Sequence, residues 1–196
     1  MEKDIQNSLK VLKKGGIILY PTDTIWGIGC DATNPLAVDQ IFRIKKRVDS
    51  KSLLVLLDDP KKLSTYVTEI PEIAWELIEV SDQPLTIVYP GGLNLASSIF
   101  HNDGSVGIRI TGDLFCKGLI RQLGRPIIST SANISGESSP ATYMDISEEI
   151  KSSVDYIVKW RQDDTIRKTP SPVIKLGLKG EIEIIRPGIP DISRKF

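Results

Sequence analysis

Cationic side chains gather in the stretch "IKKRVDSK", residues 44–51. On a helix, Lys45 and Arg47 would point about 200° apart, whereas in an extended segment residues i and i+2 share a face. If a helix ends near Ile44, both cations project the same way just before an apolar strand, and Lys51 adds a third charge. Such a group can bind a phosphate or a carboxylate. The alternative is a solvated helix end, where cations favour the carbonyl dipole.

Hydroxyl groups dominate a second stretch, "STSANISGESSP", residues 129–140, which follows a predicted buried strand. Ser129, Ser131 and Asn133 are spaced two residues apart, and with the backbone of Gly136 they could form a concave array of donors for phosphate oxygens. The stretch matches neither a Walker loop nor a Rossmann fingerprint. On composition alone, a flexible polar loop is the better interpretation of this stretch.

Two arginines and one polar turn lie where predicted strands end. Arg109 faces opposite to the apolar residues of "SVGIRI", which is usually the wet face of a strand, and Arg186 closes the last predicted strand. Ligands of α/β sheets commonly bind at strand ends. In "YPTDTIWGIGCDA" the polar residues Thr22, Asp23 and Thr24 follow a strand, so they either cap turn amides or form the rim of a ligand site.

Hydrophobic periodicity predicts the elements that position these residues. A helix begins at Asp4 as N-cap and ends at Gly15–Gly16, and a second begins at Asn34 with Pro35 in its first position. Predicted strands cover residues 17–20, 52–57, 84–89, 105–110, 125–130, 154–160, 171–176 and 181–186. Strands that alternate with helices and then accumulate predict an α/β fold, with helices packed on a mixed, twisted sheet. Because glycines and prolines fall between elements, we expect one domain over residues 1–196.

Composition narrows the classes of function. The 196 residues carry 25 basic and 25 acidic side chains, one histidine and two cysteines, Cys30 and Cys116. Zero net charge disfavours a whole-surface field for nucleic acid, and a single histidine makes a histidine-rich metal cage or a Ser-His triad a poor interpretation. No apolar run approaches the roughly 20 residues of a membrane span. We therefore expect a reduced, cytoplasmic protein, with Cys30 packed in the core.

Six ordered blocks resemble the YrdC-like family of threonylcarbamoyl-AMP synthases, in its short TsaC type. They are "YPTDTIWGIGCDA", "KKRVDSKSLLVLL", "QPLTIVY", "SVGIRI", "IISTSANISG" and "IIRPG", and they run from residue 20 to residue 188. The most diagnostic are the Lys-x-Arg pair, Lys45/Arg47, and the Ser-x-Asn pair, Ser131/Asn133. The resemblance implies a single domain with a twisted, mostly parallel sheet around a concave, positively lined cavity.

The resemblance also implies a reaction. Members of the family join L-threonine, bicarbonate and ATP and release pyrophosphate, with Mg²⁺ expected on the ATP phosphates. Their product, threonylcarbamoyl-AMP, passes to a threonylcarbamoyl transferase complex that modifies tRNA. Two alternatives stay open: a module that binds tRNA or double-stranded RNA without synthase activity, and a paralogue with other acyl chemistry.

Roles carry over residue by residue. Lys45, Arg47, Ser131 and Asn133 form the catalytic signature. The threonine ligands implied are Thr24, Leu56, Arg109, Ser129 and Ser171, with Leu56 acting as a wall or through its backbone. The ATP ligands implied are Arg47, Lys51, Ser105, Ser131, Ser139 and Arg186.

The sequence departs from the family pattern at two positions near these residues. Trp26 stands where tyrosine is common, and Pro172 follows Ser171 where threonine is usual, which puts the role of Ser171 in question. No metal ligand is assigned: Asp23 could reach a magnesium ion, and a turn cap is an equally good interpretation.

Overall fold

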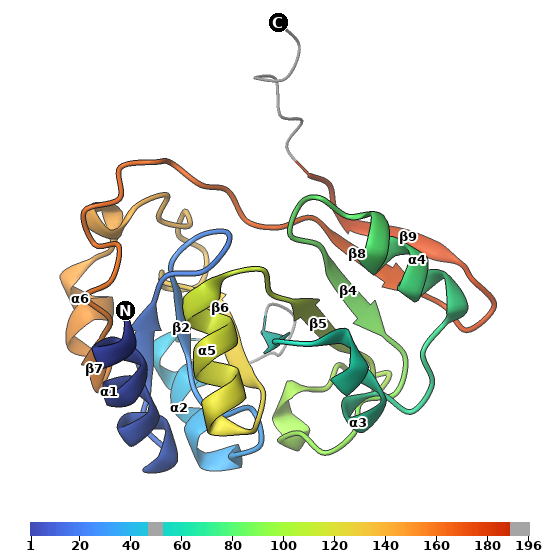
Figure 1. Ribbon diagram of the computed structural model, residues 1–196, viewed down its shortest axis with the longest axis horizontal. Coiled ribbons are helices and arrows are strands. Elements are labelled where there is room, and N and C mark those ends of the chain that lie inside the picture. The colour runs from blue at the N-terminus through green and yellow to red at the C-terminus, as the bar shows by residue number, and fades with distance from the viewer. Residues whose placement is uncertain (47–52, 189–196) are drawn as a thin grey trace, which may run out of the picture.

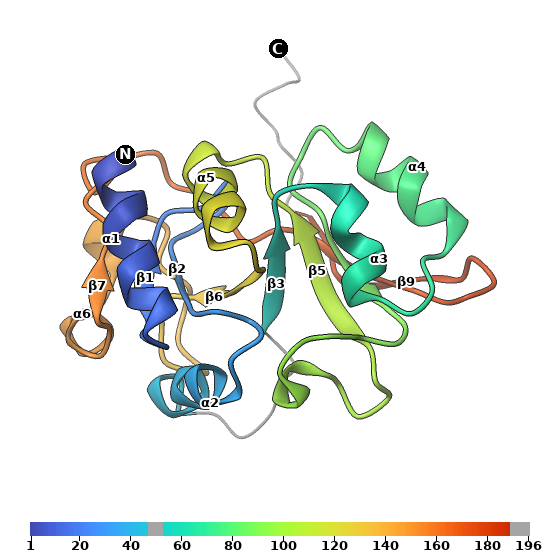
Figure 2. The ribbon, with the colours of Figure 1, turned by 60° about the horizontal axis from the view of Figure 1, so that its bottom comes forward.

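The computed structural model describes residues 1–46 and 53–188. Arg47 and Lys51, two of the predicted phosphate ligands, lie outside the described residues. Within them, the chain forms one mixed sheet with helices on both faces (Figures 1 and 2). The α/β fold expected from the sequence is therefore confirmed.

The strands of the described residues follow the order β7-β1-β2-β6-β3-β5-β4-β8-β9. They are β1 (Ile18–Tyr20), β2 (Gly27–Gly29), β3 (Leu54–Leu57), β4 (Thr86–Tyr89), β5 (Val106–Ile110), β6 (Ile127–Ser131), β7 (Tyr156–Ile157), β8 (Val173–Leu176) and β9 (Ile182–Arg186). The expectation of a mostly parallel sheet is wrong, because only β1–β7, β3–β5 and β4–β8 pair in parallel among the described strands. Short connections such as residues 21–26 and 177–181 allow only antiparallel neighbours.

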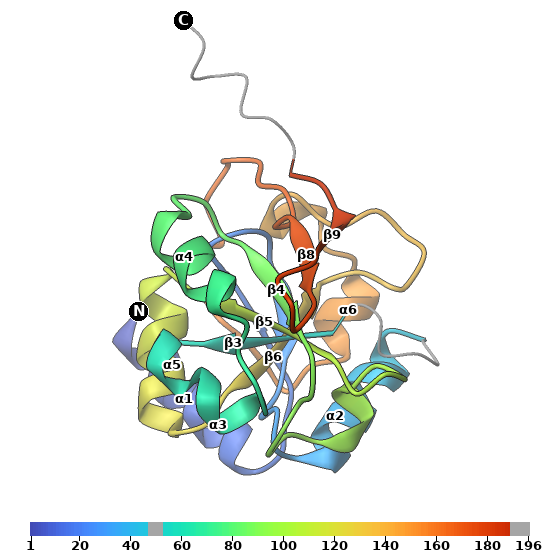
Figure 3. The ribbon, with the colours of Figure 1, turned by 90° about the vertical axis from the view of Figure 1, so that its right-hand side faces the viewer.

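Helices cover both faces of this sheet. They are α1 (Glu2–Lys13), α2 (Pro35–Ile44), α3 (Leu63–Tyr66), α4 (Glu72–Val80), α5 (Leu114–Leu123) and α6 (Glu148–Ser152). Figure 3 shows α1, α3, α4 and α5 on one side of the sheet, with α2 and α6 on the other. None of the helices in residues 1–46 and 53–188 is long and apolar enough to cross a bilayer.

The helix starts show where local sequence signals succeed and where they do not. Asn34 caps α2 as predicted, since its Oδ1 accepts from the amides of Leu36 (3.1 Å) and Ala37 (3.3 Å). Asp4 does not cap α1, because that helix begins at Glu2. Asp4 instead lies in the first turn and accepts a hydrogen bond from Tyr156 Oη at 2.6 Å, which ties α1 to β7.

The apolar strands form a buried platform. Val55, Ile108 and Ile128 lie on adjacent paired strands and are buried. Each side chain of this kind contributes about 1.5–3 kcal/mol when it leaves water. Because both faces are covered, β3 reads as a continuous apolar run rather than an alternating one.

Strand β2 is an element that periodicity does not predict. Its sequence is Gly-Ile-Gly, yet it pairs antiparallel with both β1 and β6. A Cβ at Gly29 would collide with the carbonyl of Ile128 and the ring of Tyr20, so only glycine allows this close approach. The consequence is a β1–β2 hairpin whose connection, residues 21–26, holds the polar turn against the sheet.

Candidate active site

Seven of the predicted site residues line one small cavity of about 70 Å³. They come from the 21–26 turn, from β5, β6 and β9, and from two connecting loops: Thr24, Arg109, Ser129, Ser131, Ser139, Ser171 and Arg186. Its described lining holds two arginines, several hydroxyls and no carboxylate. Such a lining favours an anionic, oxygen-rich ligand.

Lys45 joins the two signature pairs. Its side chain is buried, and Nζ donates to the carbonyls of Ser131 (2.7 Å) and Asn133 (2.6 Å). The same nitrogen also lies 3.3 Å from Ser131 Oγ and 3.3 Å from Asn133 Oδ1. The ammonium therefore fixes the shape of the segment that follows β6, and it brings together Lys45, Ser131 and Asn133 as the sequence predicts.

The backbone around Lys45 differs from the expected extended segment. Helix α2 does end at Ile44 as predicted. Lys45 nevertheless keeps helical dihedral angles (φ −71°, ψ −8°), and Lys46 is left-handed at φ +50°. The reason is that the amides of both residues still bond helix carbonyls, those of Ile41 and Arg43.

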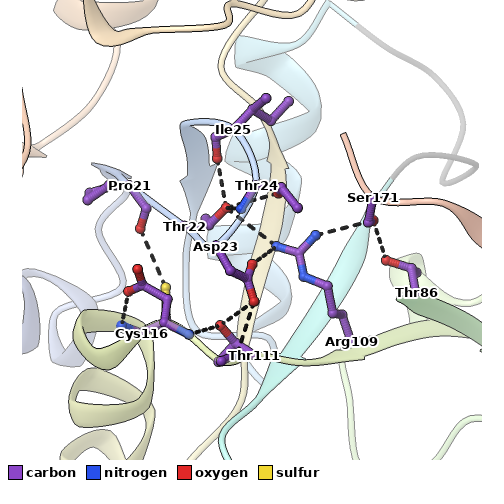
Figure 4. A network of polar contacts seen from close by, with 12 residues as sticks. Pro21, Thr22, Asp23, Thr24, Ile25, Thr86, Arg109, Thr111, Cys116 and Ser171 are labelled. Atoms are coloured by element: carbon purple, nitrogen blue, oxygen red, sulfur yellow. Dashed lines mark hydrogen bonds and ion pairs between the residues drawn. The ribbon is translucent and has the colours of Figure 1, made fainter. Parts of the chain in front are cut away.

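The polar turn is built around Thr22 and Asp23 (Figure 4). Thr22 Oγ1 donates to the Ile25 carbonyl at 2.8 Å and accepts from the Thr24 amide at 3.0 Å. Asp23 Oδ2 accepts from Thr111 Oγ1 and from the Gly112 amide, both at 3.0 Å. Thr22 and Asp23 therefore stabilise the turn, as the capping interpretation predicts. Thr24 lines the cavity, and the role of this turn as the rim of a ligand site stays a prediction.

Arg109 is buried, with 2% of its surface exposed, so the expectation of a wet strand face is wrong. It does project opposite to Ile108 and Ile110, but Asp23 meets it there, with Nη2 and Oδ1 3.0 Å apart. The remaining contacts are longer, 3.3 Å to Ser171 Oγ and 3.5 Å to Thr22 Oγ1. Among the described residues its buried Nε has no hydrogen-bond acceptor.

A second guanidinium adds positive charge. Arg186 Nε donates to the Ser171 carbonyl at 2.9 Å. Burial, reinforced by the charge of Arg109, lowers the pKa of Arg186. Arg109 and Arg186 repel each other, and among the described residues only the carboxylate of Asp23 forms an ion pair with either of them. This leaves an excess of positive charge, which a bound anion would offset.

Ser171 keeps its place despite the Pro172 departure. Its hydroxyl lies 2.8 Å from Thr86 Oγ1 and accepts from Arg109. Pro172 contributes its carbonyl to the Thr86 amide, so the proline extends the β4–β8 pairing and leaves the serine facing the arginine. At the second departure, the buried Trp26 lines the cavity and packs against Tyr143, with ring centroids 5.0 Å apart.

Two predicted ligands are not in the described lining of this cavity. Leu56 is fully buried beside Arg109, its partner in the β3–β5 pairing, whereas Leu54, two residues earlier on β3, is in the lining. Ser105 precedes β5, four residues from Arg109, and its hydroxyl contacts Asp103 at 2.6 Å and His101 Nδ1 at 3.0 Å. The rise of a strand places Ser105 about 13 Å from Arg109.

The structure also reveals site residues that sequence reasoning missed. The connection between β7 and β8 carries Arg161 and Lys168, whose side chains donate to the Thr22 carbonyl at 3.3 and 3.4 Å. They hold the polar turn through its backbone, whereas Arg109 contacts its side chains. Isolated cations in a polar loop give no local signal, so only the fold could find them.

A protein-built magnesium site finds no support in the described residues. Nowhere in them do three histidine, cysteine or acidic side chains gather in a way that could hold a metal ion. Asp23, the candidate from sequence, is already engaged by Arg109, Thr111 and Gly112. The described residues therefore offer no protein cage for the ion, and the Mg²⁺ expected on the ATP phosphates stays a prediction.

The family model Sua5/YciO/YrdC, described as "Telomere recombination", matches residues 10–188. The chain belongs to this family. The resemblance seen in the six sequence blocks is thereby confirmed. Five of those blocks contribute residues to the described cavity lining, whereas "QPLTIVY" contributes none.

Individual relatives are consistent with this family assignment. A Vibrio vulnificus protein named threonylcarbamoyl-AMP synthase is 28% identical over 161 residues, which is 81% of this chain and 87% of that protein. P. abyssi Sua5, solved in complex with L-threonine, is 28% identical with a TM-score of 0.79. That match covers 90% of this chain but only 52% of the Sua5 chain, so this chain spans about half the length of Sua5. E. coli YciO, at 23% identity, shares the fold with a TM-score of 0.82 over 98% of this chain and 93% of that one.

Proposed function

We propose that this chain, acting as one domain over residues 1–196, is a threonylcarbamoyl-AMP synthase. It would join L-threonine, bicarbonate and ATP and release pyrophosphate. The observation that carries the proposal is the convergence of hydroxyls and two arginines on one cavity, in a fold shared with a protein that binds L-threonine.

Threonine recognition follows from the charges. The substrate carboxylate would lie against Arg109, whose Nε has no acceptor among the described residues, with Arg186 as a second positive charge. The hydroxyls of Ser129 and Ser171 would hydrogen-bond to the same carboxylate. Thr24 would contact the rest of the amino acid. We expect serine to be a poor substrate, because a lost methyl contact costs about 1–3 kcal/mol.

The chemistry then needs no nucleophilic side chain. Bicarbonate takes up a proton and loses water, which gives carbon dioxide. The neutral amine of threonine then adds to the carbon of carbon dioxide and loses a proton, which gives a carbamate. A carbamate oxygen attacks the α-phosphorus of ATP, and the bond to pyrophosphate breaks with its electron pair. Both reactants are anions, so fixed cations and correct alignment supply the catalysis.

Lys45 acts here as a positioning residue. Since its ammonium holds the carbonyls of Ser131 and Asn133, it shapes the segment on which ATP would rest. Ser131 and Ser139 line the cavity and would bind phosphate or ribose oxygens. Arg47 and Lys51 complete the proposed phosphate ligands from outside the described residues, and Ser105 belongs to the proposal only if ATP extends along β5. Magnesium is assigned no step.

Pyrophosphate release from ATP tests the proposal. We expect release to require both threonine and bicarbonate, and to fall at least tenfold, or about 1.4 kcal/mol of barrier, in Arg47→Ala and Ser131→Ala. The matched control is Ser64→Ala, which removes an exposed hydroxyl on α3. Release that ignores threonine would sink the synthase proposal.

Partners form a separate part of the proposal. We expect the product to pass to a threonylcarbamoyl transferase complex in the cytoplasm, where tRNA is the final acceptor. An RNA-binding module is the alternative. Tight, salt-dependent RNA binding that survives Ser131→Ala would favour that module, because phosphate contacts alone would then explain it.

A further inference from the structure

A second and larger cleft, of about 460 Å³, lies on the other face of β4 and β5. The strands and the residue before β4 give it an apolar floor of Leu85, Ile87, Tyr89, Ile108 and Ile110, and Ile78 of α4 adds a further apolar residue to the lining. Residues alternate between faces along a strand, so Ile108 and Ile110 point into this cleft while Arg109 between them lines the proposed threonine cavity. Cavities of about 300–1,000 Å³ with an apolar floor are typical of small-molecule sites.

One end of the cleft is polar. Thr111 and Gly112 follow β5 there, and both donate to Asp23 Oδ2. The loop between α4 and β4 reaches the same end, because the antiparallel register of Thr86 with Arg109 continues towards Gln83 and Gly112. That loop contributes Asp82, an exposed carboxylate at the rim.

Lys117 supplies the opposite charge from α5. The helices α4 and α5 lie on the same side of the sheet (Figure 3), so they flank the cleft. The described lining thus offers two carboxylates, one ammonium and a broad apolar floor. A zwitterion with an apolar body matches these features: its ammonium pairs with a carboxylate, its carboxylate with Lys117, and its side chain with the isoleucines.

We propose that this cleft binds an α-amino acid with a large apolar side chain, as an effector of the threonine cavity on the other face of the sheet. Asp23 connects the two sites. It lines the effector cleft, and it also forms the 3.0 Å ion pair with Arg109. The effector site goes beyond the proposed synthase function, and its binding can be measured whether or not the chain is a synthase.

The sign of the coupling follows from charge. Asp23 disfavours a second carboxylate beside Arg109, because like charges repel. An effector ammonium near Asp23 offsets that negative charge and leaves Arg109 freer to bind the threonine carboxylate. The effector therefore tightens threonine binding, and by linkage threonine tightens effector binding by the same factor.

Calorimetry on the full chain tests binding first. The probes are L-leucine, 4-methylpentanoate, which lacks the ammonium, and 3-methylbutylamine, which lacks the carboxylate. We expect L-leucine to bind at least tenfold more tightly than either analogue. Failure of all three to bind at millimolar concentration, or equal binding of all three, overturns the proposal.

Variants then locate the site. Lys117→Glu should weaken L-leucine at least tenfold, whereas Lys3→Glu, the same charge change at an exposed position on α1, should leave it unchanged. Asp82→Asn should weaken it by a smaller factor, and this variant stands in if Lys117→Glu fails to fold. If L-leucine binding ignores both cleft variants but is lost in Ser171→Ala, leucine occupies the threonine cavity and the proposal fails.

The coupling is measured with threonine itself. We expect saturating L-leucine to lower the Kd of L-threonine about fivefold, at the lower end of typical coupling between sites, and to do so in wild type and Lys3→Glu but not in Lys117→Glu. If threonine does not bind at all, the synthase proposal fails while leucine binding still stands or falls by the first experiment. Leucine binding with no effect on bound threonine overturns the effector role.

Discussion

Lys45 and Arg109 are both buried cations of the candidate active site, but their closest partners differ in kind. Lys45 donates its shortest hydrogen bonds to backbone carbonyls, at 2.6 and 2.7 Å, and contacts Ser131 Oγ and Asn133 Oδ1 at 3.3 Å. Arg109 meets side chains, through one ion pair at 3.0 Å and hydrogen bonds of 3.3 and 3.5 Å, and its buried Nε has no acceptor in the described residues. One cation organises its own chain, and the other keeps capacity for a ligand.

The difference teaches what each residue does. Short bonds to carbonyls fix a backbone segment, and substrate gains little by breaking them. Longer bonds to hydroxyls can be exchanged for a carboxylate at small cost, because the hydroxyls can rotate towards other partners. Lys45 should therefore matter for stability and catalysis together, whereas Arg109 should matter mainly for threonine.

The largest expected effect comes from Lys45→Met. The buried carbonyl of Asn133 and the part-buried carbonyl of Ser131 would lose their donor, at about 1–3 kcal/mol for a fully buried group and less for the other, so we expect about 2–4 kcal/mol lower stability in urea unfolding. Pyrophosphate release should fall about a hundredfold, or roughly 2.7 kcal/mol in the barrier. The matched control is Lys46→Met, which removes an exposed ion pair with Glu149 and should change little. Equal effects of Lys45→Met and Lys46→Met would contradict the role of Lys45 in fixing the segment that follows β6.

Arg109→Lys should come next in size. A lysine keeps the charge but loses the planar fork that binds a carboxylate through two parallel bonds. We expect the KM for threonine to rise about tenfold or more, about 1.4 kcal/mol, with a smaller change in the KM for ATP. Arg121→Lys, at a largely exposed position on α5, should leave both constants unchanged. A greater loss for ATP than for threonine would place Arg109 at the nucleotide.

Ser171→Ala should have a moderate effect. One hydrogen bond contributes about 1 kcal/mol, so the KM for threonine should rise about fivefold while stability changes little. Thr86→Val sharpens this test, because it removes the neighbouring hydroxyl (2.8 Å away) and leaves the bond between Arg109 and Ser171. If Thr86→Val costs more than Ser171→Ala, the serine only supports the strand pairing.

The smallest expected effect concerns Asp4, far from the cavity. Burial raises its pKa, but the bonds from Tyr156 Oη and the Lys159 amide outweigh burial, and the net pKa lies below the ordinary value. A lowered pKa in the folded state stabilises the fold above the unfolded pKa of about 3.9, and this stability is lost as the pH falls through the folded value. Urea unfolding between pH 2 and 7 should show wild type losing its advantage over Asp4→Asn in acid. Asp39→Asn, at an exposed position on α2, should track wild type throughout.

Much of the fold could be predicted because its signals are local. The Asn34 cap, the Pro35 start of α2 and the apolar strands depend on neighbouring residues. Strand β2 could not be predicted, because two of its three residues are glycines, selected by the close approach of β1 and β6. The prediction that Asp4 caps α1 was wrong for a similar reason, because the partner of its carboxylate, Tyr156, is 152 residues away in the sequence.

By itself, the sequence determined the residue types of the site, the ends of most elements and the membership in a family whose motifs run in order along the chain. Only the tertiary structure decided that Arg109 is buried against Asp23, that Lys45 holds carbonyls 86 and 88 residues away, and that Ser105 and Leu56 are outside the described lining of the cavity. The physical reason is the sequence separation over which each interaction acts. Helix caps and hydrophobic periodicity depend on residues a few positions apart, whereas burial and charge pairing depend on distant segments that meet only in the assembled sheet.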